Sequence, residues 1–401
     1  MTFNKYLIDF QKGKLLEEPI FFQHKEYISL ITQKLNQDNM IILSGLKHVG
    51  KTSLIKEFLT KSGQEKQTFY YNHGLNVKDN ISCGNDLINS LNNTLEYNNN
   101  INIIVLQNFN KIKNIKDFIH FIYAHNKKFK IILLGNTIKI SGVHEVELLT
   151  ESVHNNKEKH DLEIILYYGL LPEILLIQHK HFKKKFLDLI VNDIFTKEIF
   201  LNLGVKSIDL YKFTISYMSK SDLSLSLREL HKGLSLIKQI TLKTTIDYVD
   251  FSIQVKILKP VYRYDYKKDK IISSRVKYYF TDTGIRNSIS QYTLSEAILK
   301  ENLLFQELSY NGYTIYSGMN GTFDFTFLVE KNSIKTIFHY SKQTDKTELK
   351  KEINKLNKIP GAGKRYLIID KLEDFQIKKI KYENVEIIEY ENIFERIHSH
   401  N

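Results

Sequence analysis

Two glycines, a lysine and a threonine stand at a spacing that suits the binding of phosphate groups. The stretch GLKHVGKT matches the pattern G-x-x-x-x-G-K-T at Gly45, Gly50, Lys51 and Thr52. In this pattern glycines let backbone amides point at phosphate oxygens, the lysine offers a cation, and the threonine hydroxyl can ligate magnesium. A chance turn is the alternative, but the full match favours binding of a nucleoside triphosphate.

The residues on either side predict the elements that must hold this loop. MIILSGL before it has the length of a buried strand, and KTSLIKEFLTKS after it has apolar residues at helical spacing. A strand, a glycine-rich turn and a helix N-terminus are what a phosphate-binding loop requires. We therefore expect ATP on the whole loop and Mg²⁺ on Thr52. The expected nucleotide-binding residues are Gly45, Leu46, Lys47, His48, Val49, Gly50, Lys51, Thr52 and Ser53.

Strands and helices alternate through this part of the chain. Residues 22–37 and 85–98 have helical spacing, and TFYYNH, NIIVLQN and KIILLGN are apolar runs of strand length. Such alternation predicts a parallel sheet covered by helices on both faces. The predicted fold class is therefore α/β, with the sheet of a P-loop NTPase.

One of these strands ends in two amides where acids are usual. In P-loop enzymes an Asp at the end of a second strand holds the magnesium, and an adjacent acid commonly orients the attacking water. Here those positions carry Gln107 and Asn108, and amides neither supply charge to the metal nor accept a proton. We predict a degenerate Walker B motif with weak or lost hydrolysis. Alternatively, the acid is Asp86, Asp117 or one in residues 144–151.

Length and composition predict a multidomain globular protein. The chain has 401 residues, too many for one core, and its 42% hydrophobic and 25% charged residues are ordinary values. The N-terminal stretch lacks the features of a signal peptide, and there is one cysteine. No apolar run approaches the roughly 20 residues of a membrane span. We expect a cytoplasmic protein.

The pattern changes after about residue 160. Helical stretches follow without strands between them, and residues 223–282 then give two helices and two strands joined by a charged tip. That order is the layout of a winged helix-turn-helix. Strands and helices alternate again toward the C-terminus, which predicts a small α/β domain. The predicted domains are a P-loop domain at 15–160, a helical lid and winged helix at 161–290, and an α/β domain at 291–398.

Several segments together resemble a prokaryotic ATPase family. Besides the phosphate loop, these are GLLPE, KYYFTDTGIRNSI, FQEL and GYTIYSG. The family has an AAA+-type P-loop domain, a winged helix and a C-terminal domain with a restriction-endonuclease-like fold. The resemblance covers almost the whole chain and implies ATP binding with the same three-part architecture.

The resemblance also implies roles for single residues. The family's strand ending in Leu-Asp-Glu-Ile-Gln falls on residues 106–110, so both catalytic acids are replaced. Asn136 falls where a polar side chain senses the γ-phosphate. Val143 falls where an arginine normally follows a glycine. Nucleotide sensing can therefore persist through Asn136, whereas hydrolysis is impaired.

The C-terminal domain of the family resembles metal-dependent nucleases. In those enzymes two acids hold magnesium and a lysine stabilises charge at the phosphate. Asp324 keeps its acid, but Ile337 and His339 stand at the places of the second acid and the lysine. We therefore expect no nuclease activity.

The net charge raises the question of a polyanionic partner. Lys and Arg exceed Asp and Glu by 12, which favours partners such as nucleic acid, although AT-rich coding would also enrich lysine. HKHFKKKF at 179–186 is one basic segment, for which a solvated helix face is the alternative. The predicted wing is the other, and its basic residues are Arg263, Lys267, Lys268, Lys270, Arg275 and Lys277.

Two functions are therefore open. In the first, the protein holds ATP without cleaving it, and the nucleotide acts as a switch. In the second, it is an active ATPase with an acid elsewhere, acting on nucleic acid or a protein partner. The sequence leaves the oligomeric state open.

Overall fold

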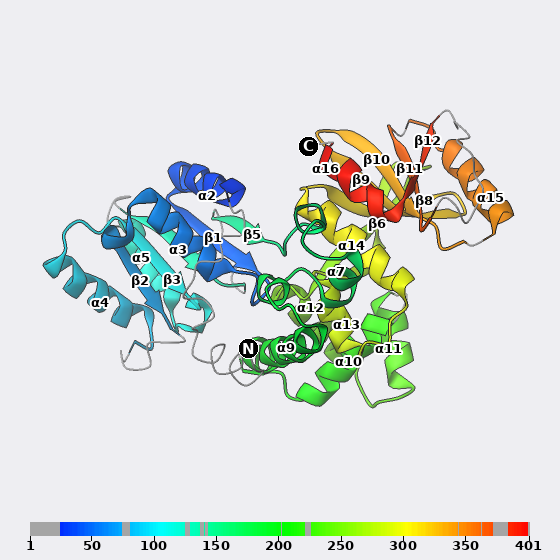
Figure 1. Cartoon of the computed structure of the whole chain (residues 1–401). Coiled ribbons are helices and arrows are strands. Elements are labelled where there is room, and N and C mark those ends of the chain that lie inside the picture. The colour runs from blue at the N-terminus through cyan, green and yellow to red at the C-terminus, as the bar shows by residue number, and fades with distance from the viewer. Residues whose placement is uncertain are drawn as a thin grey trace. The chain divides into compact units, whose positions relative to one another are not determined.

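The computed structural model describes most of the chain as two compact units, divided between Leu149 and Thr150 (Figure 1). Each unit contains its own β-sheet. The described residues are 25–73, 81–124, 129–136, 140, 143–201, 203–220, 226–343, 345–361, 363–371 and 384–399.

The first unit is a five-stranded sheet in the order β2-β3-β4-β1-β5, and every neighbouring pair of strands is parallel. The predicted α/β fold is confirmed, and the structure adds β5 to the predicted strands. The strands are β1 (Met40–Gly45), β2 (Thr68–Asn72), β3 (Ile103–Gln107), β4 (Lys130–Leu134) and β5 (His144–Leu148). The helices are α2 (Lys25–Asp38), α3 (Lys51–Ser62), α4 (Gly84–Tyr97) and α5 (Ile115–Ala124), and short 3₁₀ turns occur at η2 (Glu65–Gln67) and η3 (Phe109–Lys111).

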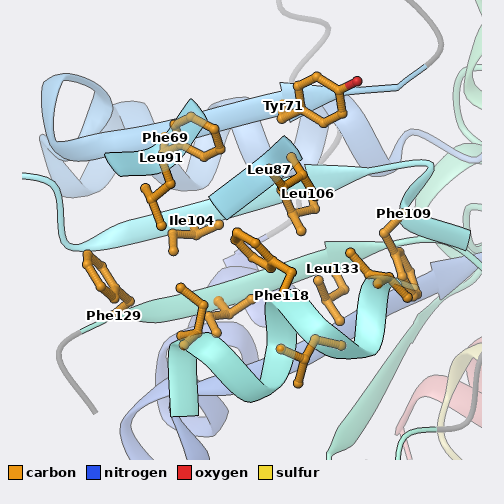
Figure 2. Close-up of a cluster of buried hydrophobic side chains, with 14 of the residues drawn as sticks. Phe69, Tyr71, Leu87, Leu91, Ile104, Leu106, Phe109, Phe118, Phe129 and Leu133 are labelled. Carbon is orange, nitrogen blue, oxygen red and sulfur yellow. The ribbon is translucent and has the colours of Figure 1, made fainter. Parts of the chain in front are cut away.

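Apolar side chains of α4 and α5 cover one face of this sheet. Figure 2 shows side chains from β2, β3 and β4 packed against those of the two helices. The alternate residues of the same strands, such as Ile103, Val105 and Ile132, are also fully buried, because α2 and α3 pack against β1 and the sheet is covered on both faces. A sheet buried in this way holds the ends of its strands in fixed places.

Helix α3 begins and ends at glycines. Gly50 precedes its first residue with φ 99°, and Gly63 follows its last residue with φ 65°, donating its N–H to the carbonyls of Leu59 and Thr60. Both backbones are left-handed, a conformation that glycine adopts without strain. Leu54 and Phe58 lie on the buried face of the helix. The glycines therefore fix where the helix starts after the phosphate loop.

The second unit begins with helices, at the places that the sequence predicts. Within it, α10, α11 and α12 pack together, and α12 contacts β6. The helices before the sheet are α6 (Val153–Asn156), α7 (Leu162–Tyr168), α8 (Pro172–Leu175), α9 (Lys180–Asp193), the π-helix η4 (Ile194–Leu201), α10 (Ile208–Lys220), α11 (Leu227–Ser235) and α12 (Leu242–Gln254). No helix in the described part of the chain has the length and apolar character needed to cross a membrane.

A mixed seven-stranded sheet in the order β12-β11-β10-β9-β8-β6-β7 forms the rest of the second unit. The hairpin of the predicted wing is part of this sheet, because β6 pairs with β8 as well as with β7. The predicted division near residue 290 stays a prediction, and the sheet runs across it. The strands are β6 (Leu258–Asp265), β7 (Lys270–Phe280), β8 (Thr314–Asn320), β9 (Phe323–Lys331), β10 (Ile334–Tyr340), β11 (Arg365–Ile369) and β12 (Val385–Glu389). The helices among and after them are α13 (Thr283–Ile289), α14 (Glu296–Tyr310), α15 (Lys346–Asn357) and α16 (Ile393–Ser399), with a 3₁₀ turn at η6 (Tyr390–Asn392).

Candidate functional site

The loop between β1 and α3 has a backbone that few sequences could adopt. Gly45, His48 and Gly50 have φ values of 141°, 68° and 99°. A Cβ atom at Gly45 would overlap the carbonyl oxygen of Leu148 on the neighbouring strand β5. Gly45 is therefore required both by its backbone angle and by the closeness of β5.

Lys51 folds back over this loop. Its Nζ donates hydrogen bonds to the carbonyl oxygens of Gly45, at 2.7 Å, and of Leu46, at 2.8 Å. The ammonium group therefore lies inside the curve of the loop, where the phosphates of a nucleotide would bring their charge. The first-turn amides of α3 start at the same point, and a helix N-terminus favours anions.

Asn136 lies beside the first residue of the loop. Its Oδ1 accepts a hydrogen bond of 2.9 Å from the backbone N–H of Gly45. This contact forms because β4 is the direct neighbour of β1 in the sheet, and Asn136 follows the end of β4. The residue that the sequence assigns to γ-phosphate sensing thus contacts the loop itself.

Gln107 connects the end of β3 with the start of α3. Its Nε2 donates to Oγ1 of Thr52 at 3.1 Å, and its Oε1 accepts from the hydroxyl of Tyr70. The side chain that replaces the usual acid therefore reaches the residue predicted to hold magnesium, but it arrives there as a neutral amide.

Asn108 points to a different partner. Its Nδ2 donates to Oδ1 of Asn72 at 2.9 Å, and its φ of 58° is a left-handed conformation that asparagine tolerates better than most residues. Asn72 ends β2, so the two amides join the ends of neighbouring strands. At the position where an acid would orient water, the side chain is occupied by a hydrogen bond within the protein.

The structure assigns places to the alternative acids. Oε1 of Glu145 accepts from Oγ of Ser44 at 2.5 Å, directly before the phosphate loop. Asp86 accepts from the backbone of Ser82 and Cys83 at the start of α4, and these bonds lower its pKa to about 2. Asp117 is an exposed residue of the first turn of α5. Of the three, Glu145 is bonded to a residue next to the loop, whereas Asp86 is committed to a helix start.

A second polar cluster, in the second unit, joins the segments GLLPE and KYYFTDTGIRNSI. Asp282 accepts from the backbone N–H of Leu170 at 2.8 Å and of Ile285 at 3.0 Å. A Cβ at Gly169 would overlap its carboxylate, and a Cβ at Gly284 would overlap the carbonyl of Tyr168. Burial raises the pKa of Asp282 to about 6. The two segments are therefore adjacent in space and packed without room for larger residues.

Buried side chains of α13 and α14 complete this cluster. Oε1 of Gln306 accepts from the backbone N–H of Thr283 at 2.8 Å. The guanidinium of Arg286, which is 2% exposed, donates to the carbonyl of Ser219 at 3.1 Å and to Oδ1 of Asn302 at 3.2 Å. Sequence reasoning took these segments as family motifs and did not predict this contact, which serves packing.

The positions that correspond to a nuclease site are not brought together as ligands. Asp324 is paired with Arg263, and Ile337 is fully buried. His339 is buried, and its Nδ1 lies 3.3 Å from Oγ1 of Thr326. Within the described residues, no three His, Cys, Asp or Glu side chains could together hold a metal ion.

The basic segment 179–186 is only partly a surface feature. Lys183 is 1% exposed, and its Nζ donates to the carbonyl of Ile174 at 2.6 Å. Burial lowers its pKa to about 8. Lys184 lies over the ring of Tyr292 at 4.4 Å from the centroid. These two lysines of the segment support the packing of α9.

Family comparisons cover both units. Residues 37–157 match the family described as AAA domain, and residues 159–296 match a domain of unknown function (DUF8612). Together with the strand order, the first match makes the first unit an AAA+-like P-loop ATPase domain and confirms the resemblance inferred from sequence for this part. No curated protein matches the chain.

Solved structures with a similar course of the chain include three ATP-related proteins. The Walker-type ATPase PABY2304 of Pyrococcus abyssi is 12% identical, with a TM-score of 0.48, covering 68% of this chain and 97% of that one. AMPPCP-bound DnaA from Aquifex aeolicus is 14% identical, with a TM-score of 0.27, covering 57% and 87%. Cdc6p from Pyrobaculum aerophilum is 7% identical, with a TM-score of 0.26, covering 71% and 94%.

Proposed function

We propose that the first unit binds ATP with Mg²⁺ and that cleavage of the nucleotide is weak or lost. The phosphate loop carries the first half of this proposal. Gly45 and Gly50 have the backbone that turns amides inward, and Lys51 already holds a cation over the loop. Bound phosphates would take over the Nζ hydrogen bonds that the loop carbonyls now accept.

The side chains at the end of β3 carry the second half. Gln107 places an amide on Thr52, so the metal would gain an oriented hydroxyl without a second negative charge. Asn108 is bonded to Asn72 and has no proton-accepting group for an attacking water. Bound ATP·Mg²⁺ would then order the loop and act by mass action, since binding stabilises the state that binds.

An active ATPase is the second candidate function, and Glu145 favours it. Its carboxylate accepts from Ser44 beside the loop, which makes it the best-placed acid of residues 144–151 within the first unit. Glu151, whose pKa burial raises to about 7, belongs to the second unit. In this case Glu145→Gln would abolish turnover and leave ATP affinity within about threefold.

The test is to measure ATP binding by calorimetry and phosphate release on one purified sample. We expect binding without turnover in the wild type, and a loss of affinity of about 100-fold in Lys51→Ala, because charged hydrogen bonds contribute about 1.5–3 kcal/mol each. Lys56→Ala is the matched control, since Lys56 lies on the exposed side of the same helix. Equal affinities in both variants would contradict the binding proposal. Turnover in the wild type that Lys51→Ala abolishes would contradict the loss of cleavage.

A further inference from the structure

The tip of the β6–β7 hairpin lies against the segment that follows α15. Lys335, at the start of β10, donates to the hydroxyl of Tyr264 at 2.7 Å and pairs with Asp269 at 3.1 Å. A Cβ at Gly361 would lie 3.7 Å from the hydroxyl oxygen of Tyr266. We call the surface formed by residues 266–270 and 358–364 the hairpin surface.

The hairpin surface carries an excess of unmatched positive charge. Lys267, Lys270 and Lys358 are exposed, and none of them has an ion-pair partner among the residues that the structure describes. The acids nearby are already matched, because Asp269 pairs with Lys335 and the buried Asp265 lies 3.7 Å from Nζ of Lys268. The net charge at this place is therefore positive.

A buried guanidinium adds to the charge beneath this surface. Arg365 is 4% exposed, and its Nη2 donates to the carbonyl of Ile359. Its Nε and Nη1 have no acceptor within the described chain. Arginine stays protonated in proteins, and a buried charge that no carboxylate neutralises extends its field to the surface above it.

Aromatic side chains accompany these cations on the same hairpin. Tyr262 is 44% exposed on β6, and Tyr266 is half-buried at the tip. Lysines interleaved with exposed aromatic rings are typical of surfaces that follow a nucleic-acid backbone and stack its bases. An acidic protein segment would match the charge but would not use the rings.

We propose that the hairpin surface binds the phosphate backbone of a nucleic acid, with Lys267, Lys270 and Lys358 as its contacts. This inference is independent of the nucleotide site, because every residue it uses lies in the second unit. Phosphate contacts by lysines position a strand and carry no sequence information, so binding should be nearly independent of base sequence.

The experiment measures binding of labelled single-stranded DNA, RNA and duplex DNA to the full chain by fluorescence anisotropy over a range of salt. The test variant is Lys267→Gln/Lys270→Gln/Lys358→Gln. The matched variant is Lys180→Gln/Lys184→Gln/Lys185→Gln on α9, which removes the same charge from the other basic segment. Circular dichroism checks that both variants are folded.

We expect the hairpin variant to bind single strands about 50-fold more weakly at ~0.15 M salt and to lose about two from the slope of log K against log salt, since each phosphate contact contributes about 0.7. The α9 variant should bind nearly as the wild type does. The proposal is overturned if both variants lose equally, if the α9 variant loses more, or if the wild type binds no nucleic acid. It is equally overturned if polyglutamate binds as tightly, with the same response to the variants.

Discussion

The phosphate loop and the Asp282 cluster are both dense groups of polar residues, yet their side chains are committed differently. At the loop, Lys51 and Thr52 are half-buried, and their hydrogen bonds go to backbone carbonyls and to one amide. At the other cluster, Asp282 and Arg286 are buried, and each has fixed partners within the fold. The first set can exchange partners with a ligand, whereas the second cannot without loss of packing.

This difference teaches that conspicuous motifs have two physical origins. GLKHVGKT is unusual because amides and a cation must face a ligand. KYYFTDTGIRNSI is unusual because glycine, aspartate and arginine must fit among buried backbone groups without spare room. Substitutions in the first motif should therefore change binding, and substitutions in the second should change stability.

The largest expected effect is on stability, from Gly284→Ala. The new Cβ would overlap the carbonyl of Tyr168 and lie 2.8 Å from the backbone nitrogen of Gly169. Backbone atoms cannot give way as a side chain would, so we expect a loss of about 3 kcal/mol or more in free energy of unfolding. Denaturant unfolding followed by circular dichroism measures it. Gly312→Ala is the control, because its Cβ meets nothing within 4 Å and costs the left-handed strain of about 1–2 kcal/mol. Equal losses in the two variants would break the comparison.

The second prediction concerns pH and Asp282. Burial raises the pKa of this carboxyl from 3.8 to about 6 in the folded chain, so the folded state holds the proton more tightly than the unfolded state does. Its stabilising contribution is present below about pH 4 and is lost as the pH rises to 6, by about 3 kcal/mol. Asp282→Asn should remove this dependence. Unfolding curves of the two proteins at several pH values measure it, and parallel pH profiles would show that Asp282 titrates normally.

A gain of turnover is the third prediction, from Gln107→Asp/Asn108→Glu. The pair would place a carboxylate on Thr52 and a second acid where Asn108 now contacts Asn72. We expect phosphate release to rise about 100-fold, the lower range for an added general base. The same pair combined with Lys51→Ala should show no turnover. A wild type that is already active and unchanged by the pair would locate the acid elsewhere, with Glu145 as the next variant to measure.

The local parts of the fold could be predicted from the sequence. The apolar run, the two glycines and the helical spacing after Lys51 fix β1, the loop and α3, because each signal lies within a few neighbouring residues. The amides at Gln107 and Asn108 could be recognised in the same way. Their partners, Tyr70 and Asn72, could not, because these contacts depend on strand order.

Contacts between distant segments escaped prediction for a physical reason. Leu170 and Asp282 lie far apart in the chain, and nothing in either segment alone indicates the other as its partner. Lys183 belongs to a charged run, yet a carbonyl at the end of α8 satisfies its ammonium inside the fold. Such positions are decided by packing and by hydrogen-bond partners that become available after the chain has folded.

The pairing of β6 with β8 has a consequence for handling the protein. β8 receives its hydrogen bonds on one side from Arg263, Tyr264 and Asp265. A fragment that began near residue 291 would leave this side of β8 as an open edge strand, a template for pairing between chains and aggregation. A fragment meant to keep the sheet intact must therefore start before Leu258, where β6 begins.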